Sequence, residues 1–305
     1  MRSLLTSLAV AALACAGASC TGNTVGDRTA AAEPSSQTST QIFSVKGVIR
    51  ELKPDGRTVV IKHEEIPNYM PAMTMPLEVK DTNELAGVRP GDEVAFRMLV
   101  TGKEGWIDQI RKLGSTDAAE PPPRETFRRV RIVEPLEVGD TLPDYPFTNE
   151  LGQAIHLAQF KGQALGLTFI YTRCPLPNFC PRMSSHFADA CKKLSTLSDG
   201  PKNWHLLSIS FDPEFDTPGV LKNYAKRYER DTNHWSFATG ALIDIDAITE
   251  QFGLMFPREG KGFTFNHNLR TVVADAQGRV RKVFIGNDWK VDDLVAEMVA
   301  AAEAN

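Results

Sequence analysis

The sequence predicts two folded domains, a small all-β domain followed by an α/β domain, behind an N-terminal leader. Three observations support this prediction. The chain has 305 residues, a length that favours about two domains. Alternating apolar residues dominate from residue 43, whereas continuous apolar runs and amphipathic helical patterns dominate from residue 138. Between them, the stretch AAEPPPRE carries three consecutive prolines, which stiffen a linker predicted over residues 114–137.

The N-terminus reads MRSLLTSLAVAALACAGASC and predicts an export signal over residues 1–20. Its apolar run, residues 4–14, is too short to span a bilayer. Small residues before Cys20 resemble a bacterial lipoprotein cleavage box, so we expect lipidation at Cys20 and a membrane anchor. Processing at Cys15, or simple cleavage, is the alternative. The polar residues 21–42 predict a flexible tether.

Composition limits what the chain does and how its cysteines are used. The net charge of −4 argues against a nucleic-acid partner, because phosphate binding favours a basic excess. Two of the five cysteines belong to the leader, which leaves Cys174, Cys180 and Cys191. An odd number in an oxidising compartment leaves at least one thiol unpaired. A chain of this length needs no covalent staple, so we expect the pair Cys174 and Cys180 to serve chemistry.

The all-β domain is predicted over residues 43–113. The tripeptide PDG at 54–56 lies between the apolar stretches GVIREL and RTVVIKH, which is typical of a hairpin turn. The stretch DEVAFRMLV alternates and places four apolar side chains on one face, at Val94, Phe96, Met98 and Val100. Several short strands of this kind predict a small β-barrel.

The α/β domain is predicted over residues 138–305. Its first element is ALGLTFIYT, a continuous apolar run that is typical of a central strand buried on both faces. The following stretches predict, in order, a helix, a strand, a helix, two strands around a turn, and a closing helix: 183–197, 206–211, 217–229, 270–286 and 291–302. This order is typical of a thioredoxin-like α/β domain.

The loop after the first strand of this domain reads YTRCPLPNFCPRMS, with five residues between Cys174 and Cys180. Pro177 breaks any helix between them, and Pro181 predicts a helix that begins close to Cys180. Backbone N–H groups at that helix start favour a thiolate. Both disulfide exchange and soft-metal binding require a thiolate, so a redox pair, a metal site and a structural disulfide all remain open.

Three stretches of this domain resemble the Sco/SenC family of thioredoxin-like copper chaperones: TFIYTRCPLPNFCPRMS, ISFDPEFDTP and FNHNLRTVVADAQGRV. The resemblance covers residues 138–302. It implies that Cys174, Cys180 and His267 bind copper, which is chemically consistent because thiolates and imidazole suit Cu(I) and Cu(II). It also implies delivery of copper to the copper centre of cytochrome c oxidase. One departure is the spacing, since the family usually has three residues between its cysteines.

Three further residues of this domain have simpler interpretations. We expect Asp216 to cap the helix that follows it and Asp212 to lie near the metal site. Cys191 lies eleven residues after Cys180 on the predicted helix, about 16 Å away. It is therefore too distant to share the metal and is expected to be a small buried apolar residue.

The barrel carries the stretch KHEEIPNYMPAMTMPLEV, in which Met73 and Met75 point the same way on a strand. His63 ends the preceding strand on an apolar face. Such a stripe is either barrel core or a soft-metal site, because two thioethers and an imidazole suit Cu(I) or Ag(I). The histidine followed by PxMTM resembles the CusF-like periplasmic metallochaperone of copper efflux, a five-stranded OB-like barrel. That resemblance implies His63, Met73 and Met75 as ligands, with Met70 as an additional thioether where the family has a shielding tryptophan.

Taken together, the sequence predicts an exported copper chaperone, anchored on the periplasmic side or soluble in the periplasm, with two copper modules. Its expected partners are a cytochrome c oxidase subunit or another periplasmic copper recipient, a thiol reductant and, through a lipid, the membrane. Transfer of Cu(I) from neutral thioethers to thiolates would be downhill and would set a direction for relay within the chain. The alternatives are a thiol–disulfide oxidoreductase that uses Cys174 and Cys180, and a copper-resistance or storage protein.

Overall fold

The computed structural model describes residues 40–115, 132–256, 265 and 267–304. The predicted leader with Cys15 and Cys20, nearly all of the tether and most of the linker lie outside the described residues. Within the described part of the chain, no helix is both long and apolar enough to cross a membrane.

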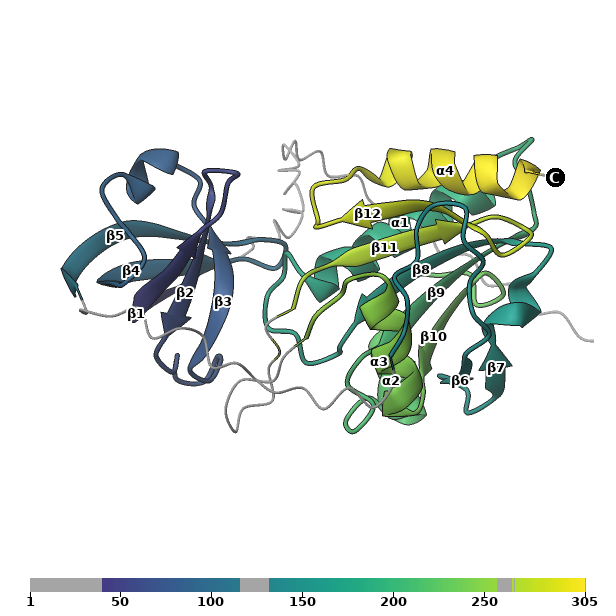
Figure 1. Ribbon diagram of the computed structural model, residues 1–305, viewed down its shortest axis with the longest axis horizontal. Helices are drawn as coiled ribbons and strands as arrows, with labels where there is room; N and C mark the ends of the chain where they lie inside the picture. The colour runs from purple at the N-terminus through teal and green to yellow at the C-terminus, as the bar shows by residue number, and fades with distance from the viewer. Residues whose placement is uncertain (1–39, 116–131, 257–264, 266, 305) are drawn as a thin grey trace, which may run out of the picture. The chain divides into compact units, whose positions relative to one another are not determined.

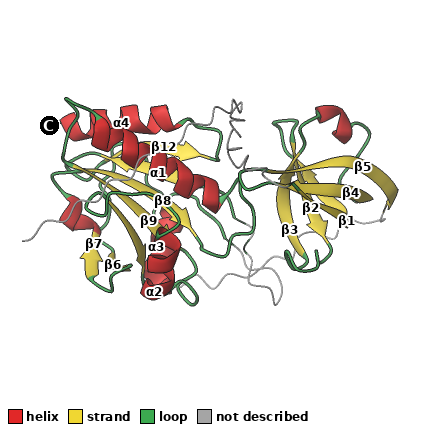
Figure 2. Ribbon diagram, turned by 180° about the vertical axis from the view of Figure 1, so that it is seen from behind, coloured by secondary structure: helices red, strands yellow, loops and turns green. Residues whose placement is uncertain are grey.

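The N-terminal domain is a five-stranded antiparallel sheet with the order β3-β2-β1-β4-β5. An isolated bridge between Val79 and Ile107 brings the end of β3 beside the start of β5, which closes the sheet on itself. Figure 2 shows this domain as strands with one short 3₁₀ helix, Thr82–Leu85. The expected five-stranded β fold is confirmed. The strands are β1 (Gln41–Leu52), β2 (Thr58–His63), β3 (Met73–Glu78), β4 (Asp92–Val100) and β5 (Gly105–Ser115).

The first hairpin of this domain turns where the sequence predicts it. The Asp55 carboxylate accepts hydrogen bonds from the backbone N–H groups of Arg57 and Thr58, both at 2.8 Å. Gly56 has a φ of +67°, a left-handed conformation that favours glycine. The alternation in β4 is confirmed too, because all four predicted apolar residues are buried: Val94, Phe96, Met98 and Val100.

The C-terminal domain is built on a seven-stranded sheet with the order β12-β11-β8-β9-β10-β6-β7. Strands β8, β9 and β10 are parallel, and the remaining neighbours are antiparallel. Figure 1 follows this sheet from β12 to β10. Its strands are β6 (Pro146–Asn149), β7 (Ala154–His156), β8 (Ala164–Ile170), β9 (Trp204–Ser210), β10 (Trp235–Thr239), β11 (Arg270–Ala274) and β12 (Val280–Ile285). Its helices are α1 (Cys180–Thr196), α2 (Pro218–Ala225), α3 (Leu242–Gln251) and α4 (Val291–Glu303).

The centre of this sheet is fully covered. Every residue of β8 and of β9 is buried, as predicted for strands with both faces packed. Helices α1 and α4 pack on each other and on β8, and the hydroxyl groups of Ser184 and Tyr224 join α1 to α2 at 3.1 Å. The thioredoxin-like arrangement is confirmed. The structure adds β6, β7, β10 and α3, which the sequence patterns did not predict.

Candidate metal centre

The two predicted ligand segments meet at one end of the C-terminal sheet. The cysteine loop follows β8 directly and ends where α1 begins at Cys180. His267 lies three residues before β11, which pairs with β8 in antiparallel register. Since the end of β8 lies beside the start of β11, the topology brings together residues that are about ninety positions apart in the sequence.

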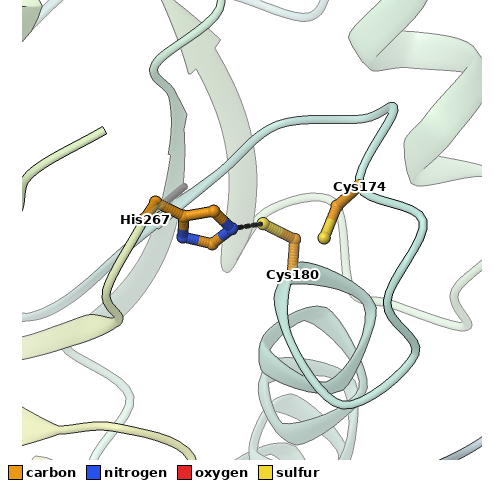
Figure 3. A group of neighbouring side chains, drawn as sticks. All are labelled: Cys174, Cys180 and His267. Atoms are coloured by element: carbon orange, nitrogen blue, oxygen red, sulfur yellow. Dashed lines mark hydrogen bonds between the residues drawn. The ribbon is translucent and has the colours of Figure 1, made fainter. Parts of the chain in front are cut away.

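The thiols of Cys174 and Cys180 and the imidazole of His267 form one cluster. Their ligand atoms all lie within 4.8 Å of one another, and Cys180 Sγ lies 3.6 Å from His267 Nε2. Figure 3 shows the Cys180 sulfur between the imidazole and the Cys174 sulfur. Cys180 and His267 are buried and Cys174 is half-buried. The fold therefore assembles a two-thiol, one-imidazole donor set.

The orientation of His267 is fixed by its own backbone and by aromatic neighbours. Nδ1 lies 2.9 Å from the Asn268 carbonyl oxygen, which only accepts, so Nδ1 carries a proton and donates it. Nε2 is then free to offer its lone pair to the thiol cluster. The rings of Tyr171, Phe179 and Phe211 surround the imidazole, with centroids 5.1–5.5 Å away. This apolar shell limits access of water to the cluster.

The two thiols have opposite acidities. Burial by itself would raise the pKa of Cys174, but side-chain hydrogen bonding with Cys180 and His267 lowers that pKa well below its ordinary value. Burial raises the pKa of Cys180 well above its ordinary value, and the neighbouring Cys174 raises it further. Burial and the second sulfur therefore oppose the effect expected of the start of α1 at Cys180, and they favour the thiolate at Cys174.

Asp216 holds the start of the cysteine loop. Its carboxylate accepts hydrogen bonds from the backbone N–H of Thr172 at 3.0 Å, from the Thr172 hydroxyl, and from the Ser210 hydroxyl at 2.5 Å. The prediction that Asp216 caps α2 is wrong, because Thr217 is the N-cap residue and its side chain accepts from the Val220 N–H. Asp216 is fully buried and faces the loop instead.

An ion pair holds the next residue of the loop, Arg173. Arg173 Nη2 donates to Asp212 Oδ2 at 2.5 Å, and the Arg173 guanidinium lies 4.0 Å above the Phe215 ring. Asp212 thus contacts the residue that directly precedes Cys174. Sequence reasoning missed Thr172 and Arg173, since their partners lie about forty residues away and no local pattern signals the pairing.

The predicted residues of the barrel also come together. In the register of β2 and β3, His63 is opposite Met73 and Ile61 is opposite Met75. His63 Nδ1 donates to the Glu64 carbonyl oxygen at 2.6 Å, and Nε2 lies 3.2 Å from Met75 Sδ. All three predicted ligands of this module are buried on one face. Each of the two candidate sites thus presents an imidazole Nε2 that is oriented by the carbonyl of the next residue.

The remaining predicted residues have separate environments. Met70 is buried among the apolar residues of the barrel, at the start of the segment that leads into β3. Cys191 is buried in the core of the C-terminal domain, as expected. Cys20, the predicted lipidation site, lies outside the described residues.

Two family models match the chain, one for each domain. Residues 134–303, more than half of the chain, match the model described as SCO1/SenC. Residues 42–112 match the model described as copper binding periplasmic protein CusF. Both resemblances noted in the sequence are therefore confirmed.

Individual relatives show the same division. The SCO1 protein homolog of Bacillus subtilis is 28% identical over 56% of this chain and 87% of its own length. The cation efflux system protein CusF of Escherichia coli O157:H7 is 26% identical over 26% of this chain and 73% of its own length. Among solved structures, a SCO1/SenC family lipoprotein from Bacillus anthracis is 26% identical, with a TM-score of 0.48 over 56% of this chain and all of that one.

Proposed function

The chain belongs to the SCO1/SenC family, and from this premise we propose that it is an exported copper metallochaperone with two copper sites. Cys174, Cys180 and His267 form one site, and His63, Met73 and Met75 form the other, with Met70 as an additional thioether. Copper is the cargo. Its recipient is the copper centre of cytochrome c oxidase or another periplasmic copper protein.

The convergence of Cys174, Cys180 and His267 carries this proposal. Three donor atoms within 4.8 Å of one another lie close enough for one ion to draw them together. Thiolates select the soft Cu(I) ion, and an imidazole makes Cu(II) acceptable as well. The lowered pKa of Cys174 provides one thiolate before the metal arrives.

The barrel site has a different donor chemistry. The contact between His63 and Met75 joins an imidazole to a thioether, and Met73 lies across the strand pair from His63. These donors are neutral, so they bind Cu(I) less strongly than thiolates do. Copper captured by the barrel therefore has a favourable destination in the C-terminal domain.

We place the protein on the periplasmic side of a membrane, held by a lipid on Cys20, with the soluble periplasmic form as the alternative. The CusF model describes a periplasmic protein, and the N-terminus has the pattern of an export leader. An oxidising compartment would couple Cys174 to Cys180, so a thiol reductant is needed as a partner to keep the copper site reduced.

Anaerobic titration with Cu(I) tests both sites. The reduced protein is compared with a Cys174→Ser/Cys180→Ser double variant against a chromogenic Cu(I) chelator. We expect two tightly bound ions in the parent protein and one in the variant. One ion in the parent and none in the variant would show that Met73 and Met75 belong only to the barrel core. No tight copper in either protein would refute the chaperone.

A thiol–disulfide oxidoreductase is the second candidate, favoured by the opposite acidities of the two thiols. His267 separates the candidates. His267→Ala should weaken Cu(II) binding at least tenfold, as the loss of one of three donors implies, and leave exchange with a small disulfide largely intact. Unchanged Cu(II) binding would remove the imidazole from the site.

Delivery and storage are distinguished in the cell. Deletion of a delivery protein should lower cytochrome c oxidase activity, with recovery on added copper. Deletion of a storage or resistance protein should instead lower the copper concentration that the cells tolerate while respiration continues.

A further inference from the structure

The two candidate sites line the same cavity. Its wall contains Met73 and Met75 from β3 of the barrel, and Cys174, Leu176, Phe179 and His267 from the C-terminal domain. Its volume of about 10 Å³ is roughly the room that one water molecule needs. Both domains belong to one compact unit of the chain, Thr38–Asn305. Thioether and thiolate donors thus face a space that admits one ion.

The residues between the two cysteines make the contact with the barrel. Leu176 is buried within the apolar cluster of the barrel, and Cys174 and Phe179 pack against the same cluster. The Tyr69 hydroxyl donates a hydrogen bond to the Pro175 carbonyl oxygen at 2.7 Å. The Tyr69 ring stacks on Phe43 of β1, with centroids 4.6 Å apart, so the donor is held by the barrel itself.

The segment also comes close to the start of β5. An added Cβ on Gly105 would lie 3.7 Å from the Asn178 side-chain oxygen and 3.9 Å from the Pro177 ring. Within the segment PLPNF, residues 175–179, Pro175, Leu176 and Phe179 contact the barrel or line the shared cavity, and Pro177 and Asn178 lie close to Gly105. A disulfide or a metal clamp within the C-terminal domain alone would not require such contacts.

We propose that residues 175–179 are a docking segment for the barrel, and that Cu(I) passes directly from Met73 and Met75 to Cys174 across the cavity that this segment closes. The proposal rests on the proposed function, because it needs copper at both sites. It also gives a physical role to the long spacing between the cysteines, since the intervening residues are the ones that hold the barrel in place.

The transfer is a ligand exchange without a change of oxidation state. The bonds from Cu(I) to His63 Nε2 and to the thioether sulfurs of Met73 and Met75 break, and bonds form to Cys174 Sγ and then to Cys180 Sγ and His267 Nε2. The proton of whichever thiol is still protonated passes to the buffer. The ion loses neutral donors and gains anionic ones, so the exchange runs toward the C-terminal domain.

The test follows the appearance of Cu(I)–thiolate charge-transfer absorption after rapid mixing of the reduced full chain with less than one equivalent of Cu(I). The expected first-order rate is independent of protein concentration and is not slowed by a Cu(I) chelator present in solution. Leu176→Glu places a charge in the apolar contact. We expect it to slow this step about tenfold or more, because the barrel is then joined to the C-terminal domain only by the linker.

Matched variants make the result specific. Leu151→Glu makes the same change at an exposed leucine outside the contact and should leave the rate unchanged. Tyr69→Phe removes only the hydroxyl that binds Pro175 and should slow transfer about twofold to fivefold. A second readout needs no metal: small-angle scattering should give a larger radius of gyration for Leu176→Glu than for the parent protein and the Leu151→Glu control.

The outcomes separate this proposal from the function on which it rests. Fewer than two bound Cu(I) ions in the parent protein would refute the two-site chaperone. Two bound ions, with a transfer rate that rises with protein concentration or is unaffected by Leu176→Glu, would overturn direct transfer alone. If Leu176→Glu lost a copper site through misfolding, Tyr69→Phe would decide, and an unchanged rate in that variant would overturn the docking segment.

Discussion

Replacement of Asp216 by alanine should destabilise the C-terminal domain modestly and weaken its copper site. The carboxylate accepts three hydrogen bonds from Thr172 and Ser210. Each bond to a charged group contributes about 1.5–3 kcal/mol, so their simple sum is about 5–9 kcal/mol. That sum is too large, because burial raises the pKa of Asp216 in spite of these bonds. The cost of burying the charge therefore offsets most of their stabilisation.

What remains after substitution is mainly the Thr172 N–H group without an acceptor, since both hydroxyl groups can rotate. An unsatisfied buried donor costs about 1–3 kcal/mol, so we expect the free energy of unfolding to fall by about 2 kcal/mol. Cys174 lies two residues beyond Thr172. A loosened loop should weaken Cu(I) binding there about tenfold to a hundredfold, the usual effect of removing a residue that orients a ligand.

Urea unfolding followed by tryptophan fluorescence measures the first effect, because Trp204 and Trp235 are fully buried in the C-terminal domain. Competition with a Cu(I) chelator measures the second. Asp216→Asn is the matched control: it keeps an oxygen for the Thr172 N–H and should lose less than about 1 kcal/mol. Equal losses in the two variants would show that the charge matters and not the acceptor. No loss in either would refute the account of the loop.

The remaining predictions concern the thiols and the barrel. Because the pKa of Cys174 is lowered and that of Cys180 is raised, Cu(I) binding near neutral pH should release one thiol proton, not two, as a pH-indicator dye would measure. Affinity should then rise about tenfold per pH unit, and a hundredfold rise would contradict the assigned acidities. Gly47→Ala should destabilise the barrel by about 1–3 kcal/mol in thermal unfolding, since the new Cβ would lie 2.6 Å from Ile61 Cγ2 and 2.7 Å from the Lys62 carbonyl oxygen. Cys191→Ser should leave the number of bound Cu(I) ions unchanged, and loss of an ion would assign this buried thiol a role in the site.

The sequence by itself determined those features whose causes are local. The PDG turn depends on one short carboxylate and one glycine within four residues. Met73 and Met75 share a face because side chains alternate along any strand. Pro181 places the start of α1 at Cys180. Family resemblance supplied His267 as the third donor, which spacing alone would not have selected.

Only the tertiary structure decided the features that join distant residues. Asp216 has the sequence position of a helix cap, but in the fold its carboxylate faces Thr172, forty-four residues earlier. The acidities of Cys174 and Cys180 follow from burial and from the approach of a second sulfur, and neither is encoded within the loop. The contacts of Leu176 with the barrel likewise depend on how two domains meet. Such contacts form between two surfaces. A sequence pattern can indicate each surface, but it does not say which surface packs against it.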